Sequence, residues 1–276
     1  MTTENHNQLI QKYFDTHAQS WQDYYQGVTD IVDMILIDRK NIAVAFLGGR
    51  LPAGARILDA GCGAGLTALE LAQKGFRVQG VDIAPNMIAL AGQNLAASGL
   101  PENACSFRLG NVLVEPEPAE DAKFDCVLAL GFLQYQADEH AALAKLNGLL
   151  KPGGLLVISG PMQTKLSNYF GLPTLLRSLK RRLTRQPQPQ PDLLHQISIH
   201  YYTVRRFKAL IREAGFRFIE YEGHGYIHFE WIDWRLNLDQ RIRLHRFFTR
   251  LSRVLPIQRY ANDIVVTARK TAQKTT

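Results

Sequence analysis

The segment Ile57–Gly65, which reads ILDAGCGAG, constrains the fold of this chain more than any other. Its apolar half has the composition of a buried strand, and its three glycines allow a tight turn in which the backbone approaches a ligand closely. The amphipathic run LTALELAQK follows, and the free N–H groups at the start of a helix there would face that ligand. The sequence therefore predicts a strand, a glycine turn and a helix that together bind a nucleotide-like molecule.

Short apolar runs and amphipathic stretches alternate from Arg56 to about Ser159. This alternation is typical of βαβ units, which build a parallel sheet covered by helices. Pro85 suits the first turn of a helix, and Lys151–Gly154 (KPGG) is predicted to be a turn before a strand. The expected strands lie near 56–60, 77–81, 105–109, 124–130 and 154–159, and the expected helices near 65–74, 85–97 and 138–150.

The pattern changes after this block. Residues 161–200 hold a basic helical stretch and then QPQPQPD, whose prolines favour extended backbone, so we expect an insertion there. Thr203 is expected to cap a helix that ends at Gly215. A strand at 216–223, a basic helix at about 235–252 and a last strand at 262–270 should follow.

Two carboxylates indicate which nucleotide binds. Leu66 occupies the sixth position of the dinucleotide fingerprint GxGxxG, which disfavours NAD or FAD. Asp82 ends the second expected strand, where a carboxylate can accept both hydroxyls of a ribose. Asp59 would repel a pyrophosphate, but it suits the ammonium group of a methionine moiety. The ligand is therefore expected to be an adenosine derivative that carries methionine.

These residues closely resemble the class I S-adenosylmethionine-dependent methyltransferases. The five motifs of that family are similar, in order, to ILDAGCGAG, GVDIAPNMI, RLGNV, FDCVLALGFLQY and LLKPGGLLVIS. The resemblance covers about 56–160 and extends to 222 in the style of the small-molecule branch. It implies an α/β, Rossmann-like fold with a seven-stranded, mostly parallel sheet in the order 3-2-1-4-5-7-6, helices on both faces, an N-terminal helical cap and two insertions.

The resemblance also implies cofactor-binding residues for S-adenosylmethionine, with no metal ion. Asp59 and the glycines would hold the methionine end, Asp82 the ribose, and Asn111 the adenine amino group. The N-terminal region is similar to the cap of the ubiquinone-type and magnesium-protoporphyrin methyltransferases, where an arginine near the position of Arg39 helps bind the cofactor carboxylate. The expected set is Arg39, Asp59, Gly61, Cys62, Gly63, Gly65, Asp82, Ile83, Met87, Asn111, Val112 and Leu130.

The acceptor side is less defined. In the ubiquinone-type relatives the fourth motif ends in Glu-His, whereas this chain has Gln134 and Tyr135, neither of which is a good base near neutral pH. The catalytic base is therefore unassigned, with histidines above the expected sheet edge and one tyrosine as candidates. The candidates are His195, His200, His224, His228 and Tyr135 for catalysis, and Trp21, Tyr25, Gln134 and Tyr226 for the substrate pocket. Each has an ordinary alternative as a core or surface residue.

The expected organisation divides the chain into six regions. The first is a helical cap and the second the cofactor-binding core; a basic Pro/Gln-containing insertion, a core helix with a strand, a substrate lid of aromatic loop and basic helix, and a last strand with its tail follow. Their boundaries are 1–50, 51–160, 161–200, 201–222, 223–261 and 262–276.

Charge and composition exclude several classes of protein. The 276 residues carry a net charge of +7, and the basic surplus lies in two segments, Lys165–Gln190 and Arg235–Arg259, so no nucleic-acid partner is expected. Their mixture of arginine and apolar residues would suit an anionic membrane surface, although solvated helix faces are the alternative. Neither a secretory signal nor a membrane span is visible, and the three cysteines suit reduced thiols, so we expect a cytoplasmic protein.

These observations together predict a methyltransferase that acts on a small, lipophilic organic acceptor in small-molecule biosynthesis. Methylation at oxygen is favoured, with nitrogen and carbon as alternatives. An RNA or protein methyltransferase is one competing hypothesis, and a non-catalytic protein that binds S-adenosylmethionine is another.

Overall fold

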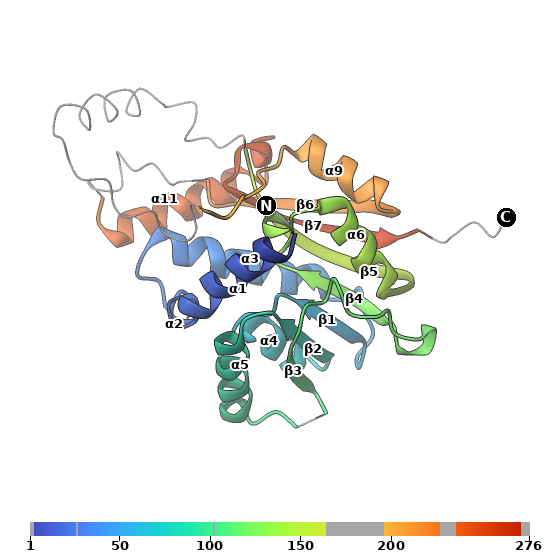
Figure 1. Cartoon of the computed structure of the whole chain (residues 1–276). Helices are drawn as coiled ribbons and strands as arrows, with labels where there is room; N and C mark the ends of the chain where they lie inside the picture. Colours follow the sequence, from blue (N-terminus) through green and yellow to red (C-terminus); the bar gives the residue numbers. More distant parts are fainter. Residues whose placement is uncertain (1–2, 26, 102, 164–195, 227–235, 272–276) are drawn as a thin grey trace.

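The computed structural model describes residues 3–25, 27–101, 103–163, 196–226 and 236–271. Seven strands form one sheet in the order β3-β2-β1-β4-β5-β7-β6 (Figure 1), which confirms the predicted fold class. Strands β1 to β5 pair in parallel, and β7 runs antiparallel to both of its neighbours. The strands are β1 (Arg56–Ala60), β2 (Arg77–Asp82), β3 (Cys105–Leu109), β4 (Phe124–Ala129), β5 (Leu150–Pro161), β6 (Phe216–His224) and β7 (Asp263–Lys270).

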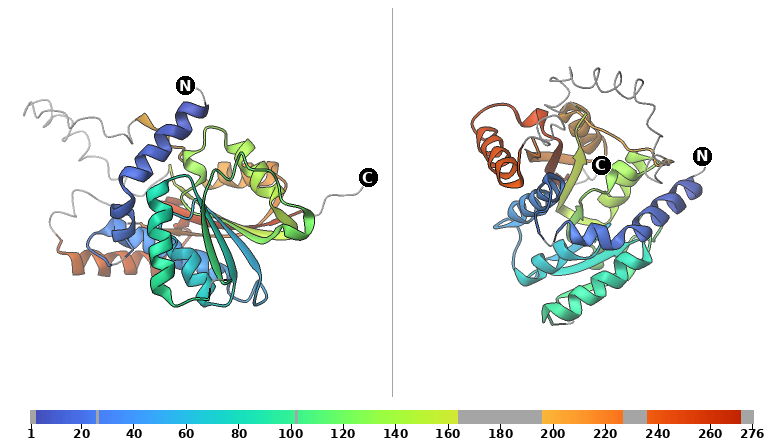
Figure 2. Two further views of the ribbon diagram at one scale, coloured as in Figure 1. Left: turned by 60° about the horizontal axis from the view of Figure 1, so that its bottom comes forward. Right: turned by 90° about the vertical axis from the view of Figure 1, so that its left-hand side faces the viewer.

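Helices cover both faces of the sheet (Figures 1 and 2). On one face lie α3 (Ile31–Leu47), α4 (Leu66–Gln73) and α5 (Pro85–Ser98), and on the other α6 (Glu139–Gly148) and α9 (Val204–Glu213). The short helices α1 (Thr3–Thr16) and α2 (Ala18–Asp23) pack against α5, and α11 (Leu238–Leu251) packs against α3. Three 3₁₀ turns complete the described elements: η1 (Glu120–Ala122), η2 (Leu133–Tyr135) and η4 (Gln258–Tyr260).

The central strands are buried on both faces, which explains their continuous apolar sequences. Successive side chains of a strand point to opposite faces. Ile57 and Cys126 accordingly join the hydrophobic core under α3 and α4, whereas their neighbours Leu58 and Val127 join the core under α6 and α9. All four side chains are at most 2% exposed, so the sheet is fixed in register by its own side-chain alternation.

Local signals set the helix boundaries. Pro85 occupies the first turn of α5 as predicted, and the Thr203 hydroxyl accepts the Arg206 backbone N–H at 3.2 Å to cap α9. Asn237 and Gln240 form a reciprocal capping box at the start of α11. That helix begins three residues later than the predicted start at about 235.

One expected turn is wrong. Residues Lys151–Gly154 belong to β5, which begins at Leu150 and not near residue 154. The ladder between β4 and β5 absorbs the extra residues, since Phe124 pairs with Leu150 and Cys126 pairs with Leu155. Gly153 has a φ of 74°, so the KPGG sequence makes an irregularity inside a strand where a separate turn was expected.

The carboxyl ends of the parallel strands meet at one edge of the sheet, and α1 to α3 lie beside this edge (Figure 2). In the described part of the chain no helix combines the length and the apolar character that a bilayer span requires. Most of the predicted 161–200 insertion falls outside the described residues.

Candidate active site

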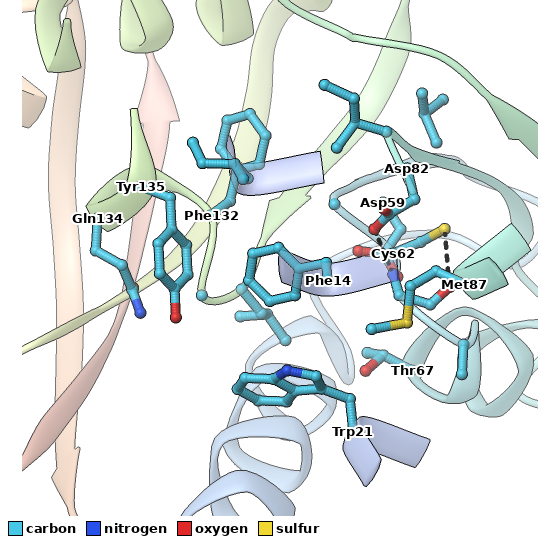
Figure 3. Close-up of a pocket in the computed structure, with 18 of the residues that line it drawn as sticks. Phe14, Trp21, Asp59, Cys62, Thr67, Asp82, Met87, Phe132, Gln134 and Tyr135 are labelled. Atoms are coloured by element: carbon cyan, nitrogen blue, oxygen red, sulfur yellow. Dashed lines mark hydrogen bonds between the residues drawn. The ribbon is translucent and has the colours of Figure 1, made fainter. Parts of the chain in front are cut away.

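A cavity of about 360 Å³ lies at the carboxyl edge of the sheet (Figure 3). Its volume falls within the range of about 300–1,000 Å³ that is usual for small-molecule sites. The loops after β1, β2, β3 and β4 form its base, and side chains of α1, α2 and α3 form its roof. This edge is where open α/β sheets bind their ligands.

The glycine turn after β1 forms one wall. Gly61, Gly63 and Gly65 have φ values of 75°, 54° and 78°, a left-handed backbone that residues with a side chain rarely adopt. Gly61 and Gly63 line the cavity, and the predicted site residue Cys62 lies between them with a buried thiol. Burial raises the pKa of that thiol well above its ordinary value, so it stays protonated and unreactive.

Gly65, which was predicted to bind the cofactor, does not line the cavity. A Cβ at this position would lie 2.4 Å from the Phe107 ring of β3 and 3.1 Å from Ala91 of α5. Gly65 therefore allows the start of α4 to pack against the sheet. Leu66 and Thr67, the next two residues, line the cavity in its place.

Asp82 fastens the glycine turn to the end of β2. Its Oδ2 accepts the Gly63 N–H at 2.8 Å, and its Oδ1 accepts the Ala84 N–H at 2.9 Å. Burial raises the pKa of this carboxyl in spite of these bonds. The carboxylate lines the cavity, and its remaining lone pairs are available to a ligand hydroxyl.

Asp59 lies beside Asp82 and is 3% exposed (Figure 3). Burial raises the pKa of this carboxyl to about 7, and the like charge of Asp82 adds to the effect. Among the described residues, no lysine or arginine forms an ion pair with Asp59. A cationic ligand in the cavity would supply the missing positive charge.

The predicted adenine-side residues also line the cavity: Ile83, Met87, Asn111, Val112 and Leu130. The Asn111 Oδ1 accepts the Leu113 N–H at 3.0 Å, which fixes the orientation of the amide. A carbonyl oxygen has two lone pairs, so this atom can accept one further hydrogen bond.

Arg39 supplies the only lysine or arginine side chain of the cavity lining in the described structure. Its Nε and Nη2 donate to the Asp263 Oδ2 at 2.9 and 2.5 Å. Burial alone would lower the pKa of this guanidinium, but the Asp263 carboxylate reverses the direction, and the pKa lies above its ordinary value. Arg39 therefore stays charged.

The roof and the far wall are aromatic. Trp21, Tyr25, Gln134 and Tyr135 line the cavity, as does Phe14, a residue that the sequence analysis missed. The Phe14 ring meets Tyr135 edge to face at 5.1 Å and lies 5.7 Å from Trp21 (Figure 3). Other lining residues that were missed are Asn7, Ile10, Val32, Ile35, Leu36, Val81, Phe132 and Gln136.

A helix-face signal could have found part of this roof. Asn7, Ile10 and Phe14 follow the i, i+3, i+7 spacing that places side chains on one face of α1. That spacing predicts that one face of the helix is buried, but it does not predict which part of the sheet this face covers.

Three further predicted residues lie elsewhere. Tyr226, predicted for the substrate pocket, is buried beside Ala261 outside the cavity and donates its hydroxyl to the Gly223 carbonyl at 2.7 Å. His224 is fully buried at the end of β6, away from the cavity lining, and burial lowers its pKa to about 4. His200 lies 3.8 Å from Glu139 and also does not line the cavity.

His195 and His228 fall outside the described residues. In the described part of the chain, His, Cys, Asp and Glu side chains form no group of three that could hold a metal ion. Tyr135 is therefore the one catalytic candidate of the sequence analysis that the described structure brings to the cavity.

A protein-family model described as a methyltransferase domain matches residues 39–221 of the 276. The chain belongs to this methyltransferase family. Its sequence places it with the class I S-adenosylmethionine-dependent enzymes of the small-molecule type, as the motifs predicted, and S-adenosylmethionine is the cofactor of that class.

Sequence relatives align with less than half of this chain. A ubiquinone biosynthesis O-methyltransferase from Xanthomonas axonopodis pv. citri is 36% identical over 120 residues, which are 43% of this chain and 48% of that protein. The corresponding protein of Methylocella silvestris is 38% identical over 119 residues, 43% and 44% of the two chains. The match thus spans about half the length of these curated relatives.

Solved structures share the fold over nearly the whole chain. Magnesium protoporphyrin IX methyltransferase from Synechocystis PCC 6803 with bound S-adenosylhomocysteine is 19% identical, with coverages of 96% and 99% and a TM-score of 0.62. The [4+2]-cyclase SpnF is 18% identical, with coverages of 96% and 97% and a TM-score of 0.64. At this identity the likeness shows the fold alone.

The charges of the cavity fit the family cofactor. A methionine moiety carries an ammonium group and a carboxylate, and the cavity offers the buried, uncompensated Asp59 at one place and the cationic Arg39 at another. The Asp82 carboxylate suits the hydroxyls of a ribose, and the positive-φ glycine turn suits a close approach of the backbone to a ligand.

Proposed function

We propose that this methyltransferase moves a methyl group from S-adenosylmethionine to an oxygen atom of a small, lipophilic organic acceptor. One observation carries the proposal. The cavity has the carboxylates of Asp59 and Asp82 on one side and the aromatic side chains of Phe14, Trp21 and Tyr135 on the other (Figure 3). The relation to ubiquinone biosynthesis O-methyltransferases supports oxygen as the methylated atom.

In this proposal the residues near β1 and β2 hold the cofactor. Asp59 meets the ammonium group, Asp82 accepts hydrogen bonds from the ribose hydroxyls, and Met87 and Asn111 pack against the adenine. When bound, S-adenosylmethionine supplies a methyl group on a positively charged sulfur, which is already a strong electrophile. The protein therefore has to align the acceptor and exclude water, and alignment is worth up to about 7–11 kcal/mol.

In the part of the chain that the structure describes, the acceptor end offers hydrogen bonds and no side chain that is a base near neutral pH. Burial raises the pKa of Tyr135, so its phenol is neutral near pH 7. Gln134 is 6% exposed, and its Oε1 has no hydrogen-bond partner in the described structure. We assign this oxygen to the acceptor hydroxyl, because a buried polar atom without a partner costs about 1–3 kcal/mol until a ligand satisfies it.

The two competing hypotheses of the sequence analysis predict other outcomes. Helices α1 and α2 cover the cavity, and this favours a diffusible acceptor over RNA or protein. A non-catalytic protein would need the cofactor end alone, whereas here a second, aromatic end adjoins it. One structural neighbour is a [4+2]-cyclase, so the fold by itself does not fix the reaction.

Mass spectrometry with S-adenosylmethionine that carries a deuterated methyl group tests the proposal. The purified protein is incubated with this cofactor and with the separated small-molecule, RNA and protein fractions of a cell extract. A deuterated product in the small-molecule fraction is expected. Label in RNA or protein would replace the proposed acceptor class, and no label in any fraction together with firm cofactor binding would favour the non-catalytic hypothesis.

A peripheral membrane contact in the cytoplasm is part of the proposal. The outer face of α11 and the turn after it exposes arginines and large apolar side chains, which are Arg243, Arg246, Phe247, Arg250, Arg253, Val254 and Leu255. Basic clusters of this kind bind anionic lipid at about 1 kcal/mol per arginine.

Co-sedimentation with vesicles tests this contact. Binding to vesicles that contain phosphatidylglycerol, loss of binding in an Arg243→Gln/Arg246→Gln/Arg250→Gln variant and no binding to phosphatidylcholine alone are expected. The arginines at 205, 212 and 217 on the other side of the fold give a matched control triple. Absence of binding at both low and physiological salt would remove the membrane from the proposal.

A further inference from the structure

Two consecutive residues of α3, Asp38 and Arg39, hold this helix between two other elements. Successive side chains of a helix point about 100° apart, so neighbours in sequence can reach different partners. The Asp38 Oδ2 lies 2.7 Å from the His245 Nε2 of α11, and Arg39 bonds to Asp263 at the start of β7. Helix α3 is thus tied outward to α11 and inward to the sheet by adjacent residues.

Both ties are removed from solvent. This holds fully for Arg39 and Asp263, whose side chains are 13% and 4% exposed, and in part for the second tie, in which His245 is 1% exposed and Asp38 is 28% exposed. A third tie, from Arg241 of α11 to Asp30 just before α3 at 2.8 Å, lies nearer the surface. Such buried charges depend on one another, because loss of one partner leaves the other charge uncompensated.

The Asp263 carboxylate is held in place by its own strand as well as by Arg39. Its Oδ1 accepts the Ile264 N–H at 2.8 Å, and its backbone lies between Pro161 of β5 and His224 of β6. The buried His224 imidazole has no hydrogen-bond partner in the described structure, so it does not draw the carboxylate away from Arg39. The carboxylate therefore presents Oδ2 to the guanidinium in one place only.

The remaining nitrogen of Arg39 lies toward the site. With Nε and Nη2 bonded to Asp263, Nη1 lies 2.7 Å from the point where a Cβ of Gly131 would stand. Gly131 and Arg39 both line the cavity. Because Gly131 has no side chain, the guanidinium fits beside the loop after β4. Arg39 thus lines the cavity while its Nε–Nη2 edge is bonded to Asp263.

We propose that Asp263 is a positioning residue that holds Arg39 where it binds the carboxylate end of the cofactor, and that His245, through Asp38, is a second and weaker one. Helix α11 and the start of β7 would then set affinity for that end of the ligand without touching the ligand. This inference rests on the proposed function, since it takes S-adenosylmethionine as the ligand.

A pair of ligands that differ by one carboxylate tests the assignment. Calorimetric titration compares S-adenosylhomocysteine with S-adenosyl-3-thiopropylamine, which keeps the adenosine, the thioether and the amine but lacks the carboxylate. Asp263→Asn should weaken S-adenosylhomocysteine by about tenfold and change the decarboxylated ligand by less than about twofold, because only the first uses Arg39. His245→Asn should act in the same direction, by about threefold.

Matched controls separate positioning from general damage. Asp125→Asn breaks the ion pair with Lys151 at the other end of the strands, and His140→Asn changes an exposed histidine; both should leave the two affinities unchanged. The double variant Arg39→Gln/Asp263→Asn, which leaves no uncompensated charge, should bind like Arg39→Gln alone. It keeps the test usable if Asp263→Asn folds poorly.

Several results would overturn the inference. An equal loss for both ligands in Asp263→Asn would make the residue structural, and unchanged affinities would show that Arg39 needs no support. Tight wild-type binding of both ligands with the same affinity would remove the carboxylate contact. If the wild-type protein bound neither ligand, the proposed function would fall as well, and that outcome is distinct from the others.

Discussion

Two pairs of buried charged residues line or adjoin the cavity, and they are compensated in opposite ways. Arg39 and Asp263 form a complete ion pair within the protein. Asp59 and Asp82 are two carboxylates side by side, and burial raises the pKa of both. The charges of the first pair neutralise each other in the folded protein, whereas the charges of the second pair are neutralised only when a cation binds.

The difference separates residues that build the site from residues that await the ligand. A protein selected for stability alone would not retain a carboxylate whose burial raises its pKa to about 7. Asp59 is therefore expected to lower the stability of the free protein and to strengthen the binding of a cationic ligand. The following predictions, from the largest effect to the smallest, test whether the two ends differ in this way.

Asp82→Ala should have the largest effect on cofactor affinity. The carboxylate is assigned to two ribose hydroxyls, and hydrogen bonds to a charged group are worth about 1.5–3 kcal/mol each, so S-adenosylhomocysteine should bind about a hundredfold more weakly. Calorimetric titration measures the loss. Asp125→Ala, at the start of the adjacent part of the sheet, serves as control, and an affinity within about twofold of wild type for Asp82→Ala would remove the ribose assignment.

Asp59→Asn should weaken the cofactor and stabilise the free protein together. Its pKa is raised above the unfolded value of 3.8, so the ionised form disfavours the folded state, and stability is lost as pH rises through about 7. At pH 8 the amide should increase the free energy of unfolding by about 2–4 kcal/mol, while affinity for S-adenosylhomocysteine falls about thirtyfold.

Urea unfolding of the ligand-free protein at pH 8 and pH 5 checks this prediction. The gain should be largest at pH 8, clearly smaller at pH 5 and absent only below about pH 4, because at pH 5 wild-type Asp59 is neutral in the folded state but still ionised in the unfolded state, where its pKa is 3.8. A destabilised Asp59→Asn at pH 8 would mean that the carboxylate has a cationic partner within the protein, and the contrast between the two charge pairs would disappear.

Cofactor affinity should depend on pH through the same group. Only ionised Asp59 attracts the ammonium group, and at pH 6 about a tenth of a carboxyl with a pKa near 7 is ionised, so binding should tighten about tenfold between pH 6 and pH 8 and level off above. Fluorescence titration across this range measures the profile. The Asp59→Asn variant should give a flat profile, and a wild-type profile equally flat would contradict the assignment.

Tyr226→Phe should have the smallest effect. The variant loses one buried hydrogen bond to the Gly223 carbonyl, which is worth about 1 kcal/mol of stability, and cofactor affinity should not change because Tyr226 lies outside the cavity. Tyr135→Phe provides the matched change inside the cavity, where methyl transfer is measured. A loss of methyl transfer in Tyr226→Phe alone would place the acceptor beneath α11.

The cofactor end of the site was predictable because its signals are local. The strand, the turn and the helix around Gly61 and Gly63 follow from the order of residue types. Asp59 and Asp82 are then identified by their places at the ends of the first two strands. The position of Gly65 outside the cavity lining was not predictable, because in sequence a glycine needed for packing against Phe107 looks like a glycine needed for a ligand.

The acceptor end was less predictable because it depends on how distant elements dock. Phe14 reaches the cavity because α1 packs across α5, and no local sequence pattern predicts this packing. The cluster around His224 and Tyr226 looks like a pocket in sequence. In the structure β6 continues through His224, which pairs with Asp263, and both side chains turn into the interior.

The most direct test of the contrast between the two charge pairs is calorimetric titration of the wild-type protein with S-adenosylhomocysteine and, separately, with NADH. Micromolar binding of S-adenosylhomocysteine and no binding of NADH are predicted, because Asp59 lies where a dinucleotide would place its pyrophosphate. Binding of NADH, or no binding of S-adenosylhomocysteine, would contradict the account and show that Asp59 and Asp82 do not form a site for S-adenosylmethionine.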